Sequence, residues 1–450
     1  MIETQIITEK YENGEMQRYQ IAKGFTWSDI SFSIPPFSKE AYDEFVRMYE
    51  AFIIPKHRSW YGALVIFHFP KDIKIPFSFE TDIGTVFDPQ LAFAAELEKQ
   101  YKAGLIKKEN DDIVVCDKKT NDFISFLKEE GWLKVLCGDK DCISILPISN
   151  TFGYLSQTTP CPKLSVNSHF FTMDVFDHDS PYDTFGVSYG LALKEGVVIQ
   201  PPLFYREALL VDKNQKSYVK KISVTDLSIT INGITFKDGE NATFFQRPLD
   251  RVTPKTSGSD IVIIGNKVIA YHKGGETLIP SSGFIIQTKE DISYLESQVI
   301  YNGLEDYVFG LQVGSAVVRE TEKITELSSP FYDIEIDPIS YPPTLYPLDY
   351  EAARAPRMAI GATKDDEPIL IWSEGCSKLR YDRGNESAGT SLLELADFGY
   401  RQGLKHLVNL DGGGSAEMFI DGKTMMHVSD RHPDNSDSER PVPMGLIIRQ

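Results

Sequence analysis

One short segment near the C-terminal end of the chain combines residue types that can do chemistry. Residues 409–415 read Asn-Leu-Asp-Gly-Gly-Gly-Ser, so a carboxylate (Asp411) precedes three glycines and a hydroxyl (Ser415). Three consecutive glycines weaken a strand, but they permit close backbone approaches that a Cβ would prevent. Successive exposed N–H groups form a cradle for an anion. A carboxylate beside such a cradle predicts an enzyme site for a sugar or a phosphate-bearing substrate.

Six further polar side chains stand at the ends of expected strands and helices, and these are Asn167, His169, Arg357, Thr390, Glu394 and Arg440. Arginine forks match the geometry of phosphate oxygens, so the two arginines are candidates for holding a phosphate. A second carboxylate is a candidate for general acid or base work. The hydroxyl of Ser415 is better suited to donating to a substrate than to acting as an esterase nucleophile, because Glu417 stands where a nucleophile elbow needs glycine.

Each of these residues also has a purely structural interpretation. Ser391 and Glu394 fit a capping box, in which the glutamate only satisfies the N-terminus of a helix. Asp411 could initiate a turn, Asn167 could bond to neighbouring backbone, and His169 could be a core histidine with satisfied nitrogens. Isolated arginines most often form surface salt bridges that contribute little free energy.

A second polar segment invites a metal-site interpretation through His427, Asp430, His432 and Asp434. The segment is rich in turn-forming residues, which favours a solvated loop. Its place between the glycines and Arg440 predicts a loop over the cleft. No cofactor is expected, and a divalent cation bound by this segment or by Asp411 is the alternative.

In order along the chain, these pieces resemble the phosphodiester glycosidase family. The matching pieces are Asn167 with Phe170-Phe171, Ile279-Pro280 with Gly283, Arg357 to Gly361, Gly389 to Ala396, Asn409 to Ser415, and Arg440. The resemblance covers residues 160–450, and its most specific part is the Asn409–Ser415 stretch. One position departs from the pattern: this chain has Ser373-Glu374-Gly375-Cys376 where the family usually has an aspartate-glycine pair that shapes the cleft.

The resemblance implies a hydrolase that cleaves the glycosidic bond between a sugar's anomeric carbon and a phosphodiester. Asp411 and Glu394 are then the catalytic candidates, and the phosphate is held by Arg357, Arg440 and the amides of Gly412, Gly413 and Gly414. Asn167, Asn409 and Ser415 position the sugar, with His169 and Thr390 as further candidates. Two alternatives stay open: a non-catalytic glycan-binding module of a cell-surface or phage-tail assembly, and a phosphodiesterase that cleaves the P–O bond.

The elements that must position these residues divide into two predicted domains of an α+β protein. Residues 1–150 are expected to form a separate α+β domain without a chemical motif, with helices at 38–52, 91–102 and 122–130 and a strand at 60–69. Residues 160–450 are expected to form a β-rich mixed α/β catalytic domain. There the pattern predicts strands at 222–231, 261–264 and 284–287 and a helix at 391–402 that ends at Gly403.

Composition narrows the classes of partner. The 450 residues carry a formal net charge of −19, which argues against nucleic acid and anionic membranes as partners. No apolar run approaches the length of a membrane span, which is about 18 residues. The N-terminal residues lack the basic and apolar regions of a signal peptide, so the sequence assigns no compartment. Residues 1–150 are a candidate region for binding to a larger assembly.

Overall fold

The structure is a computed structural model. It describes residues 2–36, 40–41, 44, 153–172, 186–203, 205–247, 250, 252–290, 297–326, 354–375, 382–432 and 436–449, together with the backbone of seven strands between residues 63 and 147. The described residues lie mostly in strands, which confirms the β-rich mixed architecture in its coarse form. Among them, no helix is long and apolar enough to cross a membrane.

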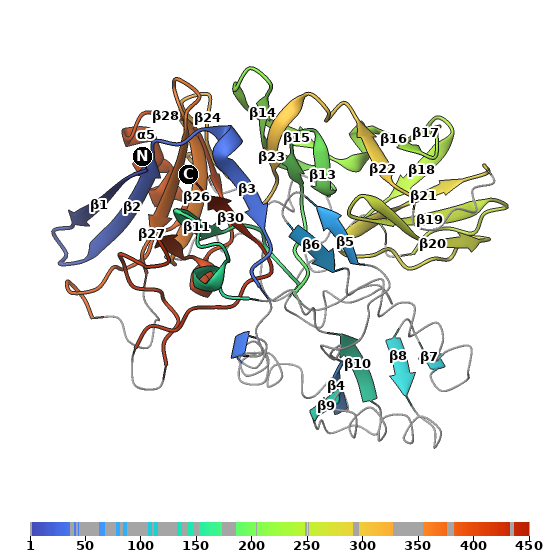
Figure 1. The fold of residues 1–450 in the computed structure, drawn as a ribbon, viewed down its shortest axis with the longest axis horizontal. Coiled ribbons are helices and arrows are strands. Elements are labelled where there is room, and N and C mark those ends of the chain that lie inside the picture. The colour runs from blue at the N-terminus through green and yellow to red at the C-terminus, as the bar shows by residue number, and fades with distance from the viewer. Residues whose placement is uncertain are drawn as a thin grey trace.

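A seven-stranded sheet with the strand order β1-β2-β27-β26-β28-β24-β25 stands at one end of the long axis of the molecule (Figure 1). Its strands are β1 (Glu3–Lys10), β2 (Met16–Lys23), β24 (Ala316–Arg319), β25 (Glu322–Lys323), β26 (Arg357–Thr363), β27 (Pro368–Ser373) and β28 (Leu404–Asn409). All neighbouring strands in this sheet pair antiparallel.

The two faces of this sheet are buried against different layers. Ile371 and Leu407 share a core with Leu395 of helix α5 (Leu392–Arg401), whereas Trp372 and Val408 face a second core. Adjacent residues of a strand point to opposite faces, so a central strand with both faces covered is apolar throughout. The burial of every residue of β27 follows from this arrangement.

The second core lies between the seven-stranded sheet and a four-stranded sheet with the order β29-β11-β30-β3. The strands of this smaller sheet are β3 (Ile30–Ser33), β11 (Leu164–Asn167), β29 (Met418–Ile420) and β30 (Gly445–Ile448). The segment from Leu410 to Glu417 therefore leaves one sheet at the end of β28 and enters the other at β29. The predicted site lies on the connection between the two sheets.

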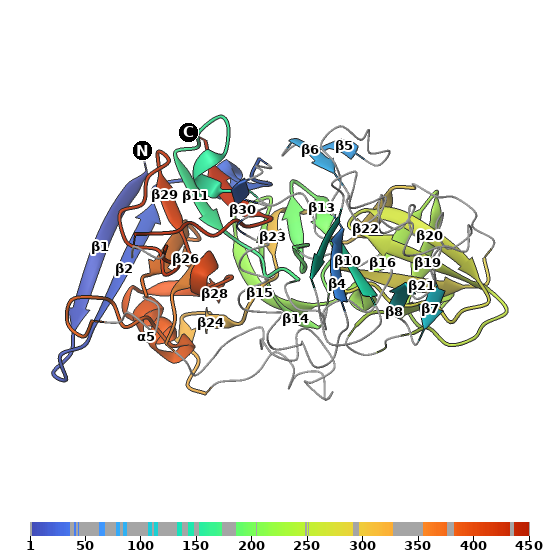
Figure 2. The ribbon, with the colours of Figure 1, turned by 90° about the horizontal axis from the view of Figure 1, so that it is seen from below.

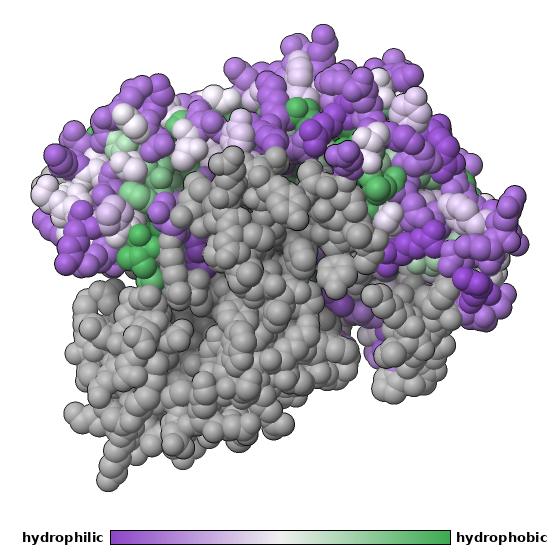
Figure 3. Space-filling view, turned by 180° about the vertical axis from the view of Figure 1, so that it is seen from behind, coloured by the Kyte–Doolittle hydropathy of each residue, from purple (hydrophilic) through white to green (hydrophobic). Residues whose placement is uncertain are grey.

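Three further sheets extend toward the other end of the molecule (Figures 1 and 2). The first contains β12 (Ala192–Lys194), β13 (Val197–Gln200), β14 (Arg206–Asp212), β15 (Ser217–Ile222) and β23 (Tyr307–Leu311). The second contains β16 (Ser228–Ile231), β17 (Ile234–Lys237) and β22 (Val299–Asn302), and the third contains β18 (Ala242–Phe245), β19 (Ser259–Ile264), β20 (Lys267–Lys273) and β21 (Gly283–Thr288). On the face shown in Figure 3, the described residues are mostly hydrophilic, with small separate hydrophobic patches.

The remaining strands lie between residues 63 and 147. They are β4 (Ala63–Phe67), β5 (Ser78–Thr81), β6 (Gly84–Phe87), β7 (Lys107–Glu109), β8 (Asp112–Val115), β9 (Leu133–Leu136) and β10 (Ile143–Pro147). Five of them form a sheet with the order β7-β8-β10-β4-β9, and β5 pairs with β6. The strand predicted at 60–69 is confirmed as β4, whereas the helices predicted at 38–52, 91–102 and 122–130 lie almost wholly outside the described residues.

Strand pairing corrects the predicted N-terminal boundary. Strand β2 pairs with β27, and β3 pairs with β30, so residues 3–33 belong to the two sheets that carry the site. The sequence of β1 to β3 holds no signal for this long-range pairing, and the rest of the proposed boundary stays a prediction. The strand predicted at 222–231 is wrong in its first half, because Ser223 caps a short turn at Val224–Asp226 before β16 begins.

Candidate active site

The glycine loop, defined here as residues 411–417, is fastened at both ends by Asn167, the last residue of β11. The Asn167 Nδ2 donates to the backbone oxygen of Asp411 at 2.6 Å, and its Oδ1 accepts the Glu417 N–H at 3.2 Å. The Asp411 N–H donates to the Ser168 carbonyl at 2.9 Å. The predicted site residue Asn167 thus lies at the loop, where its side chain bonds to backbone.

A side chain would be opposed at each of the three glycines for a different reason. A Cβ on Gly412 would lie 2.9 Å from the Pro356 oxygen, and a Cβ on Gly414 would lie 2.1 Å from the Arg440 Nη2. Gly413 has a φ of 62°, a conformation that residues with a Cβ rarely adopt. Its N–H donates to the Pro356 carbonyl at 3.0 Å, so this amide is not available to an anion. Fewer amides are therefore available to bind an anion than the three that the sequence predicts.

The carboxyl of Asp411 is placed to change its protonation near neutral pH. Its side chain is half-buried, and this burial raises its pKa to about 7. The Ser415 hydroxyl, the Arg440 guanidinium and the Gly412 N–H lower the pKa and offset part of the effect of burial. Carboxyl groups with a pKa near the working pH can exist in either form during a reaction.

Arg440 lies directly against the loop, because the missing side chain of Gly414 leaves room for its guanidinium. The Arg440 Nε donates to Asp430 Oδ2 at 2.8 Å, and Nη2 donates to Oδ1 at 3.2 Å. Such a two-point ion pair fixes the plane of the guanidinium. The predicted phosphate-binding arginine is thus held in a defined orientation beside Asp411.

A second carboxyl group in the loop, Glu417, was not among the predicted site residues. It is completely buried, and its Oε1 accepts the Arg440 N–H at 2.7 Å, while its Oε2 has no hydrogen-bond partner among the described residues. Burial, reinforced by nearby Glu439, raises its pKa well above the usual range, so we expect a neutral carboxylic acid. One signal for it exists in the sequence, which is a single acidic residue in the otherwise apolar run 416–420.

Arg357 and Thr390 approach the loop from the side of helix α5. The buried Arg357 donates from Nε to the Thr390 carbonyl at 3.0 Å, and the backbones of Thr390 and Ala355 bond to each other in both directions. The Arg357 Cδ would lie 3.7 Å from a Cβ on Gly412. Arg357 therefore lies beside Gly412, and Thr390 contacts Arg357 through its backbone oxygen.

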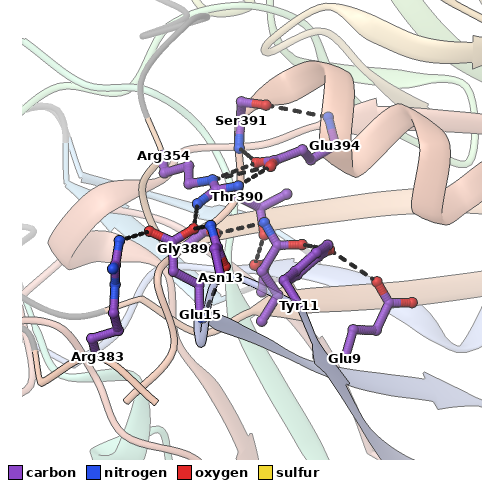
Figure 4. A network of polar contacts seen from close by, with 12 residues as sticks. Glu9, Tyr11, Asn13, Glu15, Arg354, Arg383, Gly389, Thr390, Ser391 and Glu394 are labelled. Atoms are coloured by element: carbon purple, nitrogen blue, oxygen red, sulfur yellow. Dashed lines mark hydrogen bonds and ion pairs between the residues drawn. The ribbon is translucent and has the colours of Figure 1, made fainter. Parts of the chain in front are cut away.

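Glu394 forms the predicted capping box and also an ion pair (Figure 4). Its carboxylate accepts the Ser391 N–H at 2.9 Å and two donors of Arg354, the shorter at 2.6 Å, while Arg354 Nη1 reaches Glu15 at 2.6 Å. Burial acts to raise the pKa of Glu394, but these bonds hold it below the usual range. Its structural interpretation is confirmed, and its catalytic role stays a prediction.

Comparison with known proteins places this arrangement in a family. A sequence profile of the family described as phosphodiester glycosidase matches residues 225–449, half of the chain. The chain belongs to this family. Curated relatives named N-acetylglucosamine-1-phosphodiester alpha-N-acetylglucosaminidase from mouse and human are each 33% identical over 79 residues, which is 18% of this chain and 14% of theirs.

Two solved structures align with this chain at low similarity. A hypothetical protein from Synechocystis aligns with a TM-score of 0.43 and 12% identity, over 99% of this chain and 61% of its own. The zebrafish N-acetylglucosamine-1-phosphodiester alpha-N-acetylglucosaminidase catalytic domain, auto-inhibited by its pro-peptide, aligns with a TM-score of 0.40 and 11% identity, over 100% of this chain and 83% of its own.

The position that departs from the phosphodiester glycosidase pattern is occupied by a buried ion pair. Glu374 pairs with Arg18 of β2 at 2.8 Å, and it accepts the His427 N–H at 2.8 Å. Through these two contacts, the buried carboxylate of Glu374 connects the hairpin of β1 and β2 to the segment that follows the glycine loop.

Two further predicted residues are buried in the structure. His169 is a buried core histidine, whose Nε2 lies 2.9 Å from the Leu191 carbonyl, and burial lowers its pKa to about 4. Asn409 is buried at the end of β28, next to the loop.

Two aspartates in the segment considered for a metal form ion pairs in the structure. Asp430 pairs with Arg440, and the His427 Nδ1 lies 3.1 Å from Asp437 Oδ2. In the part of the chain that the structure describes, which does not include Asp434, no three His, Cys, Asp or Glu side chains are grouped to hold a cation. A cation held by this segment or by Asp411 stays an untested alternative.

Proposed function

We propose that this chain is a hydrolase that cleaves the bond between the anomeric carbon of a sugar and a phosphodiester oxygen, releasing free sugar and a phosphomonoester. Membership of the phosphodiester glycosidase family supports the reaction class. One observation supports assigning this reaction to the glycine loop: the carboxyl of Asp411 has a pKa of about 7 and stands beside the guanidinium of Arg440. A carboxylate beside a cation suits a substrate that joins a sugar to a phosphate.

The proposed reaction has a simple balance. The bond between the anomeric carbon and the bridging oxygen breaks, and its electron pair leaves with the phosphate. Positive charge then develops on the sugar ring, and ionised Asp411 stabilises it. Water adds its hydroxyl to the anomeric carbon, and its second proton passes to the phosphate or to solvent. Because the leaving phosphate is already anionic, cations such as Arg440 and Arg357 serve it better than a strong acid does.

The other loop residues have supporting roles in this proposal. Ser415 and Asn409, at the two ends of the glycines, position the sugar. Asn167 holds the backbone of the loop, and the Thr390 carbonyl holds the Arg357 guanidinium by accepting its Nε–H. Glu394 is proposed to act on the site through Arg354, not as the second catalytic carboxyl group.

The test is hydrolysis of a panel of sugar-1-phosphodiesters that includes N-acetylglucosamine-1-phospho-6-mannose, with the wild type and with Asp411→Asn. We expect release of free sugar by the wild type and its loss in the variant. In isotope-labelled water the label should enter the sugar. Label in the phosphate would instead identify a P–O-cleaving phosphodiesterase. Binding to members of the panel without turnover would identify a glycan-binding module.

A further inference from the structure

The ion pair between Arg440 and Asp430 uses only one edge of the guanidinium. A guanidinium has five N–H donors, and Asp430 occupies the side formed by Nε and Nη2. Among the described residues, no hydrogen bond is formed by the three remaining N–H groups on the edge of Nη1 and Nη2. This edge suits two-point contact with phosphate oxygens. Asp430 and a phosphate can therefore bind to Arg440 at the same time.

The position of an anion on this free edge is limited by the glycine loop. The guanidinium lies on Gly414, where a Cβ would approach Cζ to 2.3 Å, whereas a Cβ on Gly413 would meet no atom within 4 Å. Asp411 and Asp430 both lie within electrostatic reach of Arg440. An anion over the open part of the loop would thus meet one guanidinium flanked by two carboxyl groups, with Arg357 close to Gly412.

These charges distinguish between two kinds of phosphate ester. A phosphodiester carries one negative charge, whereas a phosphomonoester carries between one and two at neutral pH, because its second pKa is about 6. Asp430 already neutralises the charge of Arg440, so a second negative charge on the ligand gains little from the arginine and is repelled by the carboxylate.

We propose that Asp430 is a specificity-determining residue that makes the anion position accept a singly charged phosphodiester and reject a doubly charged phosphomonoester. The inference rests on the proposed function, in which the diester is the substrate and the monoester is the product. Asp430 then also promotes release of the product, since hydrolysis creates the second charge that it repels.

The experiment measures the binding of dimethyl phosphate and methyl phosphate by calorimetry at about pH 8, where the monoester is doubly charged. In Asp430→Asn, the amide oxygen still accepts from Arg440 but the charge is gone. We expect affinity for methyl phosphate to rise about tenfold and affinity for dimethyl phosphate to rise at most about threefold. Asp430→Glu keeps the charge and should keep the wild-type ratio of the two affinities.

The matched control is Asp437→Asn, which removes the same charge from the same segment. Asp437 pairs with Arg431 and His427, not with Arg440, so the ratio of affinities should not change. An equal change for both esters in Asp430→Asn would overturn the proposal, as would loss of both or absence of binding to the wild type. Neither ester contains a sugar, so a failure of hydrolysis in the panel above would overturn the proposed function separately.

Discussion

The position of Asp411 in the fold determines the pH at which its carboxyl group ionises. It stands between the end of an apolar strand and three glycines. Its half-buried side chain loses part of its hydration without gaining a full ion pair, because Arg440 is already bound to Asp430. Desolvation without a dedicated partner raises the pKa of a carboxyl group. The same desolvation destabilises the folded protein wherever this group is ionised.

This relation predicts that Asp411→Asn stabilises the protein at alkaline pH. The carboxyl ionises near pH 4 in the unfolded chain but only at about 7 in the folded one, so stability falls as pH rises through this window. Three pKa units correspond to about 4 kcal/mol as an upper limit. Urea denaturation should show the variant gaining about 1–3 kcal/mol relative to the wild type between pH 4 and 8. An identical pH dependence for both proteins would contradict the prediction.

Glu417 leads to a different expectation, because it is buried as a neutral acid. Replacement by Gln keeps an uncharged acceptor for the Arg440 N–H, so Glu417→Gln should change the free energy of unfolding at pH 7 by less than about 1 kcal/mol. Glu417→Ala should cost about 2–4 kcal/mol, because it leaves a cavity and an unsatisfied N–H. Chemical denaturation of both variants tests this, and a large effect of the Gln variant would show that Glu417 is ionised.

At the scale of elements, the segments with strong local signals were predictable. The helix at 391–402 was predicted from Ser391, Glu394 and Gly403, and the structure has α5 at Leu392–Arg401 with Ser391 as its N-cap and Gly403 at a φ of 71°. The glycine loop was predicted to be a functional site from another local signal, which is a carboxylate followed by three consecutive glycines. The contacts of Arg440 with Asp430 and Gly414 could not be predicted, because only the fold places these residues together.

The loop itself gives a prediction with an internal control. Gly414→Ala must displace the Arg440 guanidinium, so we expect catalytic efficiency on a phosphodiester to fall about 100-fold, since small misplacements at a site have effects of this size. In Gly413→Ala the added Cβ has no atom within 4 Å, so the only expected cost in folding free energy is the strain of the positive φ, about 1 kcal/mol. Kinetics and urea denaturation of both variants check this. Equal loss of activity in both would mean that contact with Arg440 is not the reason for Gly414.

The N-terminus of α5 provides the test of the two interpretations of Glu394. Glu394→Gln keeps a cap acceptor but loses the charge that binds Arg354, so stability should fall by about 1 kcal/mol. Turnover should fall by less than about tenfold if Glu394 only holds this network, whereas general acid or base catalysis is worth about 100-fold or more. Glu15→Gln, which changes the other partner of Arg354, is the matched control for the kinetic measurement.

At the scale of the whole molecule, the site depends on strands from both ends of the chain. The N-terminal β2 lies beside β27, and β3 lies beside β30, the last strand. Phe32 of β3 is fully buried in the core between the two sheets, with Trp372 and Val408. Sequence patterns report local structure and the type of face that a strand buries, so the partner of β2 or β3 could not be read from them.

This shared architecture predicts that residues 160–450 do not fold alone, although they include the whole family match. The fragment lacks β1, β2 and β3, so it exposes Trp372 and Val408 along with the unpaired edges of β27 and β30. Exposed apolar edges of this kind lead to aggregation. Circular dichroism and denaturation should therefore show no cooperative transition for the fragment, and co-expression with residues 1–36 should restore one by supplying the missing strands. A fragment that unfolds cooperatively on its own would show that the N-terminal strands are additions to a complete domain, and Arg18 could then not be needed to hold Glu374 beside the site.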